Sequence, residues 1–288
     1  MARTFEVAQK SPRSEEKDYR RYSFWLQTAG EDLAPRAALD GAQRADVAIL
    51  GAGFTGLWTA YYLLKNAPSL RVVVLEGEVA GFGASGRNGA WCGSGFPVTP
   101  AELAQRFGRE AARGLIIEMQ STVDEVGRVA EVEGIDAQYF RGGMLRVARG
   151  PGQLPAVRAA HEAYSALGLG DDYQVLDAEE TDRRVRIKGT KGALYNPHCA
   201  SVHPGRLVRG LARTVERLGG TIFELSPVVG YETGGSPRLA TARGEVRAGA
   251  IVLAGEAYLT RFRKLRRKML PIYSLIVLTE PLSEAQWE

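Results

Sequence analysis

The sequence predicts an α/β protein built around a parallel sheet, and three consecutive segments carry this prediction. Residues 47–50 form a short uninterrupted apolar run, typical of a parallel strand that is buried on both faces. A glycine-rich turn over residues 51–56 leads into residues 57–65, whose apolar spacing predicts an amphipathic helix. Residues 71–76 then form a second buried strand. Strand, helix and strand make one βαβ unit with an expected right-handed crossover, the core of a Rossmann-like domain.

The composition is that of an ordinary globular protein. The 288 residues are 45% hydrophobic and 24% charged, and the net charge of +4 does not single out nucleic acid as a partner. Cys92 and Cys199 cannot form a disulfide framework, and three histidines show no metal-ligand spacing. Arg20 and Arg21 precede no apolar export segment, and no stretch approaches about 18 apolar residues. We therefore expect a cytoplasmic protein with no metal, no membrane partner and no nucleic-acid partner.

Helices and short strands alternate through the rest of the chain. Apolar spacing and flanking Pro or Gly predict helices over residues 101–133, 154–167 and 204–218. A hairpin turned at Gly142 and Gly143 is expected over residues 139–148. Short apolar runs predict strands over residues 193–195, 221–224, 228–232, 238–242, 250–253 and 271–280.

A dense basic run over residues 261–268 leaves two interpretations open. It is a solvated loop before a strand, or it is a nucleic-acid or membrane footprint. No aromatic platform is interleaved with the charges, which favours the solvated loop.

The turn at residues 51–56 has the chemistry of a phosphate-binding loop. It reads Gly51-Ala52-Gly53-Phe54-Thr55-Gly56, the pattern G-x-G-x-x-G. In this pattern the first glycine permits the tight turn, the second lets backbone approach a pyrophosphate, and the third lets helix and strand pack closely. The helix N-terminus adds free N–H groups and about half a positive charge. The alternative is a chance glycine-rich turn in an unrelated α/β fold.

An acidic residue stands where an adenosine ribose would be held. Glu76 follows Gly56 by 20 residues and ends the second strand. Its carboxylate can accept hydrogen bonds from ribose hydroxyls, each contributing about 1.5–3 kcal/mol. The same charge would repel a 2′-phosphate, which disfavours NADP at this site.

A second glycine-rich stretch over residues 81–89 favours FAD over NAD. A plain NAD domain needs no such turn after the ribose-binding acid, whereas FAD continues into a second phosphate, a ribityl chain and a ring system. Backbone can pass close to a cofactor at the small residues Gly83, Ala84, Ser85 and Gly86. Ser85, Arg87 and Asn88 can bond phosphates and ribityl hydroxyls. The alternative is a flexible loop.

Together these motifs resemble the D-amino-acid-oxidase superfamily of flavoproteins. The resemblance rests on residues 51–56, on Glu76 and on residues 84–89. It is supported by residues 195–199, 203–208, 227–229 and 251–255. Within the superfamily the chain is most similar to γ-glutamylputrescine oxidase-type amine oxidoreductases, from about Tyr22 to the end.

The resemblance implies where FAD is held. It assigns pyrophosphate contacts to residues 51–56, ribose to Glu76, ribityl and flavin contacts to residues 84–89, and adenine to the backbone of Val228. The candidate cofactor-binding residues are Gly51, Ala52, Gly53, Phe54, Thr55, Gly56, Glu76, Gly77, Gly83, Ala84, Ser85, Arg87, Asn88, Gly89, Val228, Ala254 and Gly255. Two positions depart from the family pattern: Ala90 replaces a glycine, and Glu256 stands where a neutral residue is usual.

The resemblance also implies an interleaved domain organisation. We expect an FAD-binding domain over residues 45–97 and 198–258. The mixed charge and scattered Pro and Gly of residues 1–44 predict an N-terminal arm, with four residues that can dock it on the body: Tyr22, Phe24, Trp25 and Leu26. Residues 98–197 and 259–288 are expected to form an incomplete α+β substrate domain. Because members of the superfamily are longer, the chain is expected to be an N-terminal fragment with impaired or absent turnover.

The implied reaction is oxidation of the C–N bond of an amine or amino acid. A neutral amine would lose hydride from its α-carbon to flavin N5, and the imine would hydrolyse. Within the superfamily a sarcosine or glycine oxidase-like enzyme is the competing expectation. Outside it, the competing expectation is a non-catalytic or degenerate flavin-binding protein that serves as a partner subunit. The oligomeric state, the amine and the electron acceptor stay unassigned.

No residue type or spacing demands a catalytic assignment. His198 and His203 either act in catalysis or, as we expect, orient the loop before a helix. Cys92 is either a flavin tether or, as we expect, a small buried residue. Residues that could face a substrate are Tyr139, Arg141 and Tyr273.

Overall fold

The computed structural model describes residues 6–7 and 17–287, and these residues form two compact units. The first unit contains the described residues up to Gly89 and those from Pro204 onward, and the second contains Ala90–His203. Of the predicted N-terminal arm, residues 1–5 and 8–16 lie outside the described residues. The division of the chain into an FAD-binding and a substrate domain stays a prediction.

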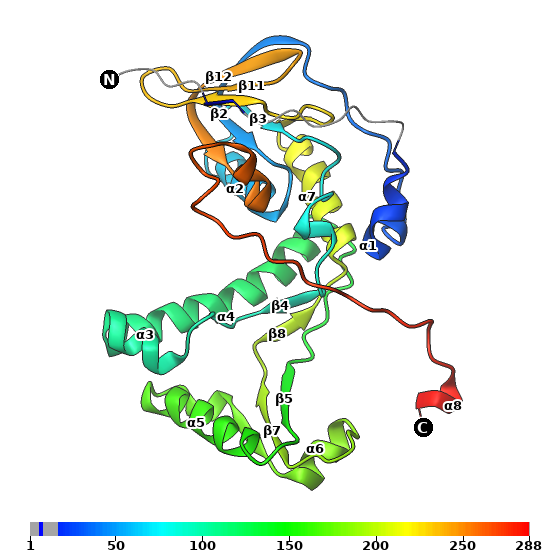
Figure 1. Cartoon of the computed structure of the whole chain (residues 1–288), viewed down its shortest axis with the longest axis vertical. Coiled ribbons are helices and arrows are strands. Elements are labelled where there is room, and N and C mark those ends of the chain that lie inside the picture. Colours follow the sequence, from blue (N-terminus) through cyan, green and yellow to red (C-terminus); the bar gives the residue numbers. More distant parts are fainter. Residues whose placement is uncertain (1–5, 8–16, 288) are drawn as a thin grey trace. The chain divides into compact units, whose positions relative to one another are not determined.

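A seven-stranded sheet forms the centre of the first unit (Figure 1). In spatial order its strands are β1 (Glu6–Val7), β10 (Gly230–Glu232), β11 (Arg238–Ala240), β12 (Gly244–Leu253), β2 (Gly41–Leu50), β3 (Val72–Leu75) and β9 (Thr221–Phe223). The pairs β12–β2, β2–β3 and β3–β9 are parallel, and the remaining pairs are antiparallel. All four residues of β3 are buried, as expected for a parallel strand with both faces covered.

Seven described helical elements belong to this unit. They are η1 (Tyr19–Tyr22), α1 (Phe24–Gln27), α2 (Phe54–Asn66), η2 (Ala84–Gly86), α7 (Pro204–Arg217), η4 (Glu256–Arg261) and α8 (Glu284–Trp287). Among them, α2 and α7 pack on the sheet. Helix α2 packs on β3 and on α7. It buries Leu57, Ala60, Tyr61 and Leu64, which confirms the apolar face predicted from the sequence.

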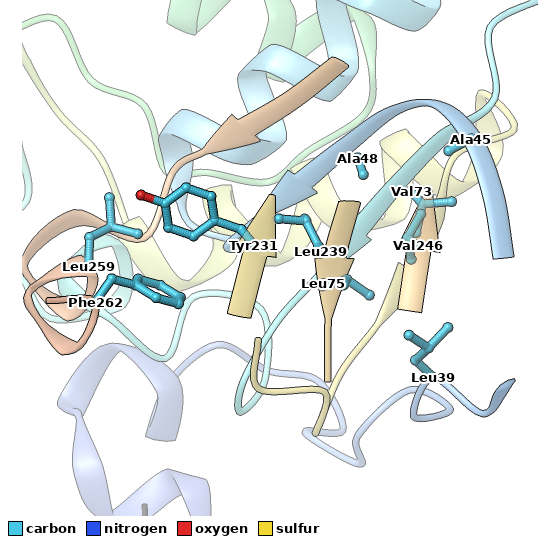
Figure 2. Packing of buried hydrophobic residues seen from close by; sticks show 10 residues of the cluster. All are labelled: Leu39, Ala45, Ala48, Val73, Leu75, Tyr231, Leu239, Val246, Leu259 and Phe262. Carbon is cyan, nitrogen blue, oxygen red and sulfur yellow. The ribbon is translucent and has the colours of Figure 1, made fainter. Parts of the chain in front are cut away.

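One cluster of buried side chains fixes the sheet to the segments that flank it. Figure 2 shows Val73 and Leu75 of β3 in this cluster with Leu239 of β11. Tyr231 of β10 meets Phe262 edge to face, with ring centroids 5.1 Å apart. Because Val73 and Leu75 alternate with Val72 and Val74, the two sets point to opposite faces of the sheet.

The second unit contains two small antiparallel sheets and four α-helices among its described elements. Its helices are α3 (Pro100–Phe107), α4 (Arg109–Val132), α5 (Gln153–Ala166), η3 (Gly170–Asp172) and α6 (Ala178–Arg184). One sheet has the order β5 (Met144–Ala148), β7 (Gly192–Asn196) and β6 (Gln174–Leu176). The other pairs β4 (Trp91–Gly93) with β8 (Cys199–Ser201).

Three predicted elements differ from the structure. The helix expected over residues 101–133 divides at Gly108, whose φ of 84° lies outside the helical region. The hairpin expected over residues 139–148 was wrong, because β5 pairs with β7 and Phe140 bridges to Ser201 instead. The two halves of the expected hairpin therefore pair with segments distant in the sequence and not with each other.

The strand expected over residues 271–280 was also wrong. No described strand pairs with this segment, and a strand needs a partner for its backbone groups. Tyr273, Leu275 and Val277 are 88–94% exposed. The basic side chains of residues 261–268 are exposed, in line with a solvated loop. None of the helices in the described part of the chain is long and apolar enough to cross a membrane.

Candidate functional site

The first glycine-rich turn joins the end of β2 to the start of α2. Gly51 has a φ of 104°, and its amide donates to the carbonyl of Leu75 over 2.8 Å. A Cβ atom at Gly51 would lie 2.5 Å from the carbonyl oxygen of Ala254. A Cβ atom at Gly56 would lie 2.0 Å from the carbonyl oxygen of Gly51. Neither position tolerates a side chain, so the turn keeps the tight backbone that the motif predicts.

Backbone N–H groups of α2 are available at this turn. Gly53 is the N-cap and supplies no side chain to the helix amides. The amide of Phe54 donates instead to the hydroxyl of Ser85 over 2.8 Å. A Cβ atom at Gly53 would lie 2.8 Å from that hydroxyl oxygen, so a side chain there would displace it. Thr55 continues the helix. A helix N-terminus with free amides and a neighbouring hydroxyl suits an anionic phosphate.

Glu76 lies against the first turn. Its Oε2 accepts from the amide of Ala52 over 2.8 Å, and its Oε1 accepts from the amide of Glu78 over 3.0 Å. Burial raises the pKa of Glu76, and the hydrogen bonds from these amides work in the opposite direction. The structure therefore brings together the acid and the glycine-rich turn that were 20 residues apart in the sequence.

The second turn repeats the backbone pattern of the first. Residues 81–86 also read G-x-G-x-x-G, a repeat that the sequence analysis missed. Gly81 has a φ of 83°, and its amide donates to the carbonyl of Ala52 over 3.0 Å. A Cβ atom at Gly86 would lie 2.2 Å from the carbonyl oxygen of Gly81. Gly83 precedes η2, which contains Ala84. The two turns thus touch each other and share a glycine spacing.

Polar side chains follow the second turn. Asn88 donates from Nδ2 to the carbonyls of Ala84 and Ser85 over 3.1 and 3.0 Å, which closes the turn. Arg87 donates from Nη2 to the hydroxyl of Tyr258 over 2.8 Å, and its guanidinium lies 4.5 Å from the ring centroid of Phe82. Tyr258 was not predicted. The sequence signal for it was its place three residues after Gly255.

The remaining predicted residues lie around Glu76 and the first turn or at the end of the second. Gly77 is next to Glu76, and its Cβ position lies 3.7 Å from Pro227. Val228 follows Pro227 and packs on the core cluster. Ala254 approaches Gly51 as described above. Gly255 follows Ala254, and a Cβ atom there would lie 2.7 Å from Cδ2 of Leu50. Gly89 is exposed at the end of the second turn, with open space at its Cβ position.

The second unit contains the candidates for substrate contact or catalysis except Tyr273, which lies in the first unit. His198 Nε2 lies 3.5 Å from Oδ2 of Asp172, and His198 Nδ1 lies 3.1 Å from Nη2 of Arg141. The hydroxyl of Tyr139 donates to the carbonyl of Val123 over 3.0 Å. These contacts place His198 and Arg141 together and tie Tyr139 to α4.

The other candidates are His203, Cys92 and Tyr273. His203 is buried, and its amide donates to the carbonyl of Ala137 over 2.7 Å. Burial raises the pKa of the Cys92 thiol to about 11, which makes it a poor nucleophile at neutral pH. Tyr273 is exposed. Within the described residues no group of His, Cys, Asp or Glu is arranged to hold a metal ion.

The two turns and Glu76 together fit a dinucleotide. The first turn offers backbone amides at a helix N-terminus, and Glu76 offers a carboxylate beside it. The second turn adds small residues and the Ser85 hydroxyl directly against the first.

Sequence comparisons give the same assignment. The profile of the family described as FAD dependent oxidoreductase (DAO) matches residues 46–288. The chain is 31% identical to a probable oxidoreductase OrdL of Haemophilus influenzae over 249 residues, 84% of this chain and 57% of the relative. It is 30% identical to the gamma-glutamylputrescine oxidoreductase of Escherichia coli over 264 residues, 91% of this chain and 61% of the relative. The chain thus spans about three fifths of the length of these relatives.

Solved structures show the same fold. The glycine oxidase of Geobacillus kaustophilus superposes with a TM-score of 0.62 at 24% identity, covering 77% of this chain and 58% of the other. The L-amino acid deaminase of Proteus myxofaciens superposes with a TM-score of 0.64 at 22% identity, covering 82% and 51%. At these identities the likeness concerns the fold.

Proposed function

The chain belongs to the family of FAD-dependent oxidoreductases, and from this membership we propose that it binds FAD and oxidises the C–N bond of an amine or amino acid. The observation that carries the cofactor assignment is the contact of Glu76 with the first turn, through the Ala52 amide over 2.8 Å. An acid held at that place can accept hydrogen bonds from a ribose while the helix N-terminus holds the adjoining pyrophosphate.

The substrate class is inferred from relatives. A glycine oxidase of Bacillus licheniformis is 29% identical over 218 residues, and a 4-methylaminobutanoate oxidase of Paenarthrobacter nicotinovorans is 28% identical over 177 residues. With the gamma-glutamylputrescine oxidoreductase, these names describe amine or amino-acid substrates. L-2-hydroxyglutarate dehydrogenases are more distant, at 26% identity. We therefore favour a CH–NH or CH–NH2 donor over a CH–OH donor.

The residues of this chain contribute binding and orientation. Bound FAD supplies the acceptor for the hydride that leaves the α-carbon of the amine. The amides of Thr55 and Gly56 at the start of α2 would hold the pyrophosphate, because the Phe54 amide binds Ser85, and Glu76 would hold the adenosine end. Ser85 and Arg87 would contact the phosphates or the ribityl hydroxyls. No residue of the chain is required as a base if the amine binds in its neutral form, because the hydride then leaves without prior proton removal.

Anaerobic reduction of the FAD-loaded chain tests this proposal. Because turnover of this chain is expected to be impaired, we expect γ-glutamylputrescine or glycine to bleach the flavin absorbance slowly, and 2-hydroxyglutarate to leave it unchanged. Bleaching by 2-hydroxyglutarate alone would overturn the substrate class. A folded, FAD-loaded chain that no amine reduces would overturn the catalytic part and support a flavin-binding partner subunit.

A further inference from the structure

Residues 17–36, here called the N-terminal segment, lie against the second glycine-rich turn. Ser23 Oγ donates to the carbonyl of Gly86 and accepts from the amide of Trp25 over 3.1 Å. Trp25 Nε1 donates to the carbonyl of Asn88 over 2.7 Å. Two side chains of the segment therefore bind two carbonyl oxygens of the turn or of the residues directly after it.

Apolar packing joins the same two parts. Leu26 is 1% exposed, and its Cδ2 lies 3.6 Å from the Cβ position of Gly86. Tyr19 and Tyr22 meet the ring of Phe82 edge to face, with centroid distances of 5.9 and 5.6 Å. Burial of a Leu side chain of this kind contributes about 1.5–3 kcal/mol. This packing therefore contributes enough free energy to favour one position of the second turn.

Ionic contacts hold the segment to the connection between Glu76 and the second turn. Glu78, whose amide donates to Glu76, accepts from Nζ of Lys17 over 2.5 Å. It also accepts from the hydroxyl of Tyr19 over 3.1 Å. The segment therefore reaches the acid of the candidate site through one intervening residue.

A second ionic contact lies at the other end of the segment. Glu224 is fully buried and accepts from Nη1 of Arg36 over 2.9 Å. It also accepts from the amide of Ala80 over 2.7 Å, just before the second turn. A buried carboxylate with several donors is costly to disturb, because removing a partner leaves charge uncompensated.

We propose that the N-terminal segment is a positioning element for the second turn, so that its docking and the binding of FAD are thermodynamically coupled. The inference rests on the proposed function, since it presumes that the second turn holds FAD. The second turn needs a positioning element because it follows a loop, whereas the first turn lies between β2 and α2. Ordering such a loop costs about 1–2 kcal/mol per residue, which contacts from elsewhere must offset.

Coupling of this kind is reciprocal. If FAD binds only the ordered turn, undocking of the segment lowers the competent fraction and weakens the apparent affinity. Bound FAD must then hold the segment in place to the same degree. If the segment only stabilised the fold, its loss would lower the stability of the chain, but FAD binding and docking of the segment would not affect each other.

Equilibrium titration with FAD, followed by flavin fluorescence, measures the first direction. Trp25→Phe keeps an aromatic ring and removes the indole N–H donor, and Ser23→Ala removes the hydroxyl. We expect each to weaken FAD binding roughly three- to tenfold, the range that corresponds to one hydrogen bond. Ser23→Thr keeps the donor and the N-cap and should restore the wild-type affinity. Gln27→Ala, an exposed position on the same helix, serves as the matched control and should bind as wild type.

Limited trypsin digestion measures the second direction. Arg20 and Arg21 are exposed within the segment, and Arg183 is exposed in the second unit. We expect FAD to slow cleavage after Arg21 by at least about fivefold, the lower end of typical coupling energies, and to leave cleavage after Arg183 unchanged. Circular dichroism of each variant shows that it is folded.

The outcomes separate the two proposals. A folded wild-type chain that takes up no FAD overturns both. Wild-type uptake of FAD, with equal affinity in Trp25→Phe and Ser23→Ala and no protection of Arg21, overturns the positioning role and leaves the proposed function standing. Weakened binding that Ser23→Thr restores, together with protection of Arg21, supports the coupling.

Discussion

The two glycine-rich turns share one backbone pattern but are held in different ways. In both, a glycine with positive φ begins the turn, and a glycine five positions later faces its carbonyl oxygen. The first turn is continuous with strand β2 and helix α2, and it also contacts Leu75, Glu76 and Ser85. The second ends in the short η2 and is covered by Ser23, Trp25 and Leu26, about 60 residues earlier in the chain. The motif therefore specifies the local backbone conformation, whereas the contacts that hold each turn depend on which other segments the fold places against it.

Substitution of Gly56 and Gly86, the last glycines of the two turns, should produce the largest losses of stability, and the two losses should differ. In Gly56→Ala the new Cβ lies 2.0 Å from backbone, and we expect a stability loss of about 3 kcal/mol or more, because β2 and α2 must separate. In Gly86→Ala the contact is 2.2 Å, but the turn can shift without moving a strand, so the loss should be smaller. Urea denaturation followed by circular dichroism measures both.

Gly235→Ala, where open space surrounds the Cβ position, is the control for these two variants. Equal losses in Gly56→Ala and Gly86→Ala would contradict the difference in support between the turns.

Glu76→Gln should weaken FAD binding by roughly 10- to 150-fold, because charge-assisted hydrogen bonds to the ribose contribute about 1.5–3 kcal/mol. Isothermal titration with FAD measures the change. Glu78→Gln is the matched control, since Glu78 contacts the N-terminal segment and not the first turn. It should weaken FAD binding less. An unchanged affinity of Glu76→Gln would remove Glu76 from the site.

The same carboxylate makes the stability of the FAD-free chain depend on pH. Burial raises the pKa of Glu76 in the folded chain above its unfolded value of about 4.3. Between the two pKa values the folded state binds more protons than the unfolded state, so its stability falls as pH rises through this window. Wild type should gain stability relative to Glu76→Gln as the pH is lowered from 7 into the window. Urea midpoints of both proteins at several pH values check this, and parallel curves would contradict it.

The smallest predicted effect concerns the residues that flank the turns. Ala90 follows the second turn with a φ of 64°, and Glu256 follows the Ala254–Gly255 pair beside the first turn with a φ of 49°. A left-handed conformation costs a non-glycine residue about 1–2 kcal/mol, part of which glycine loses again in unfolded-state entropy. Ala90→Gly and Glu256→Gly should each stabilise the chain by about 0.5–1 kcal/mol in thermal unfolding. Destabilisation by either would show that its side chain makes a needed contact.

Local patterns predicted the βαβ unit, the buried face of α2 and the adjacency of Glu76 to the first turn, because these depend on residues close in the sequence. The apolar and aromatic residues near the N-terminus favoured docking of the arm on the body, but the contacts of Ser23 and Trp25 with the second turn could not be predicted in the same way. Neither residue belongs to a periodic pattern, and their partners lie 63 residues away. The hairpin and the strand at residues 271–280 were wrong for a related reason. An apolar run indicates that a segment can pair but not which partner it meets.

We propose that the first turn and Glu76 hold the adenosine diphosphate half of FAD. Titration of the purified, folded chain with FAD and with FMN, and competition by ADP, tests it most directly. We predict uptake of one FAD, displacement by ADP, and binding of FMN at least about tenfold weaker, since FMN lacks the ribose that Glu76 recognises. Equal affinity for FMN and FAD without competition by ADP, or a folded chain that takes up no flavin, would contradict the account.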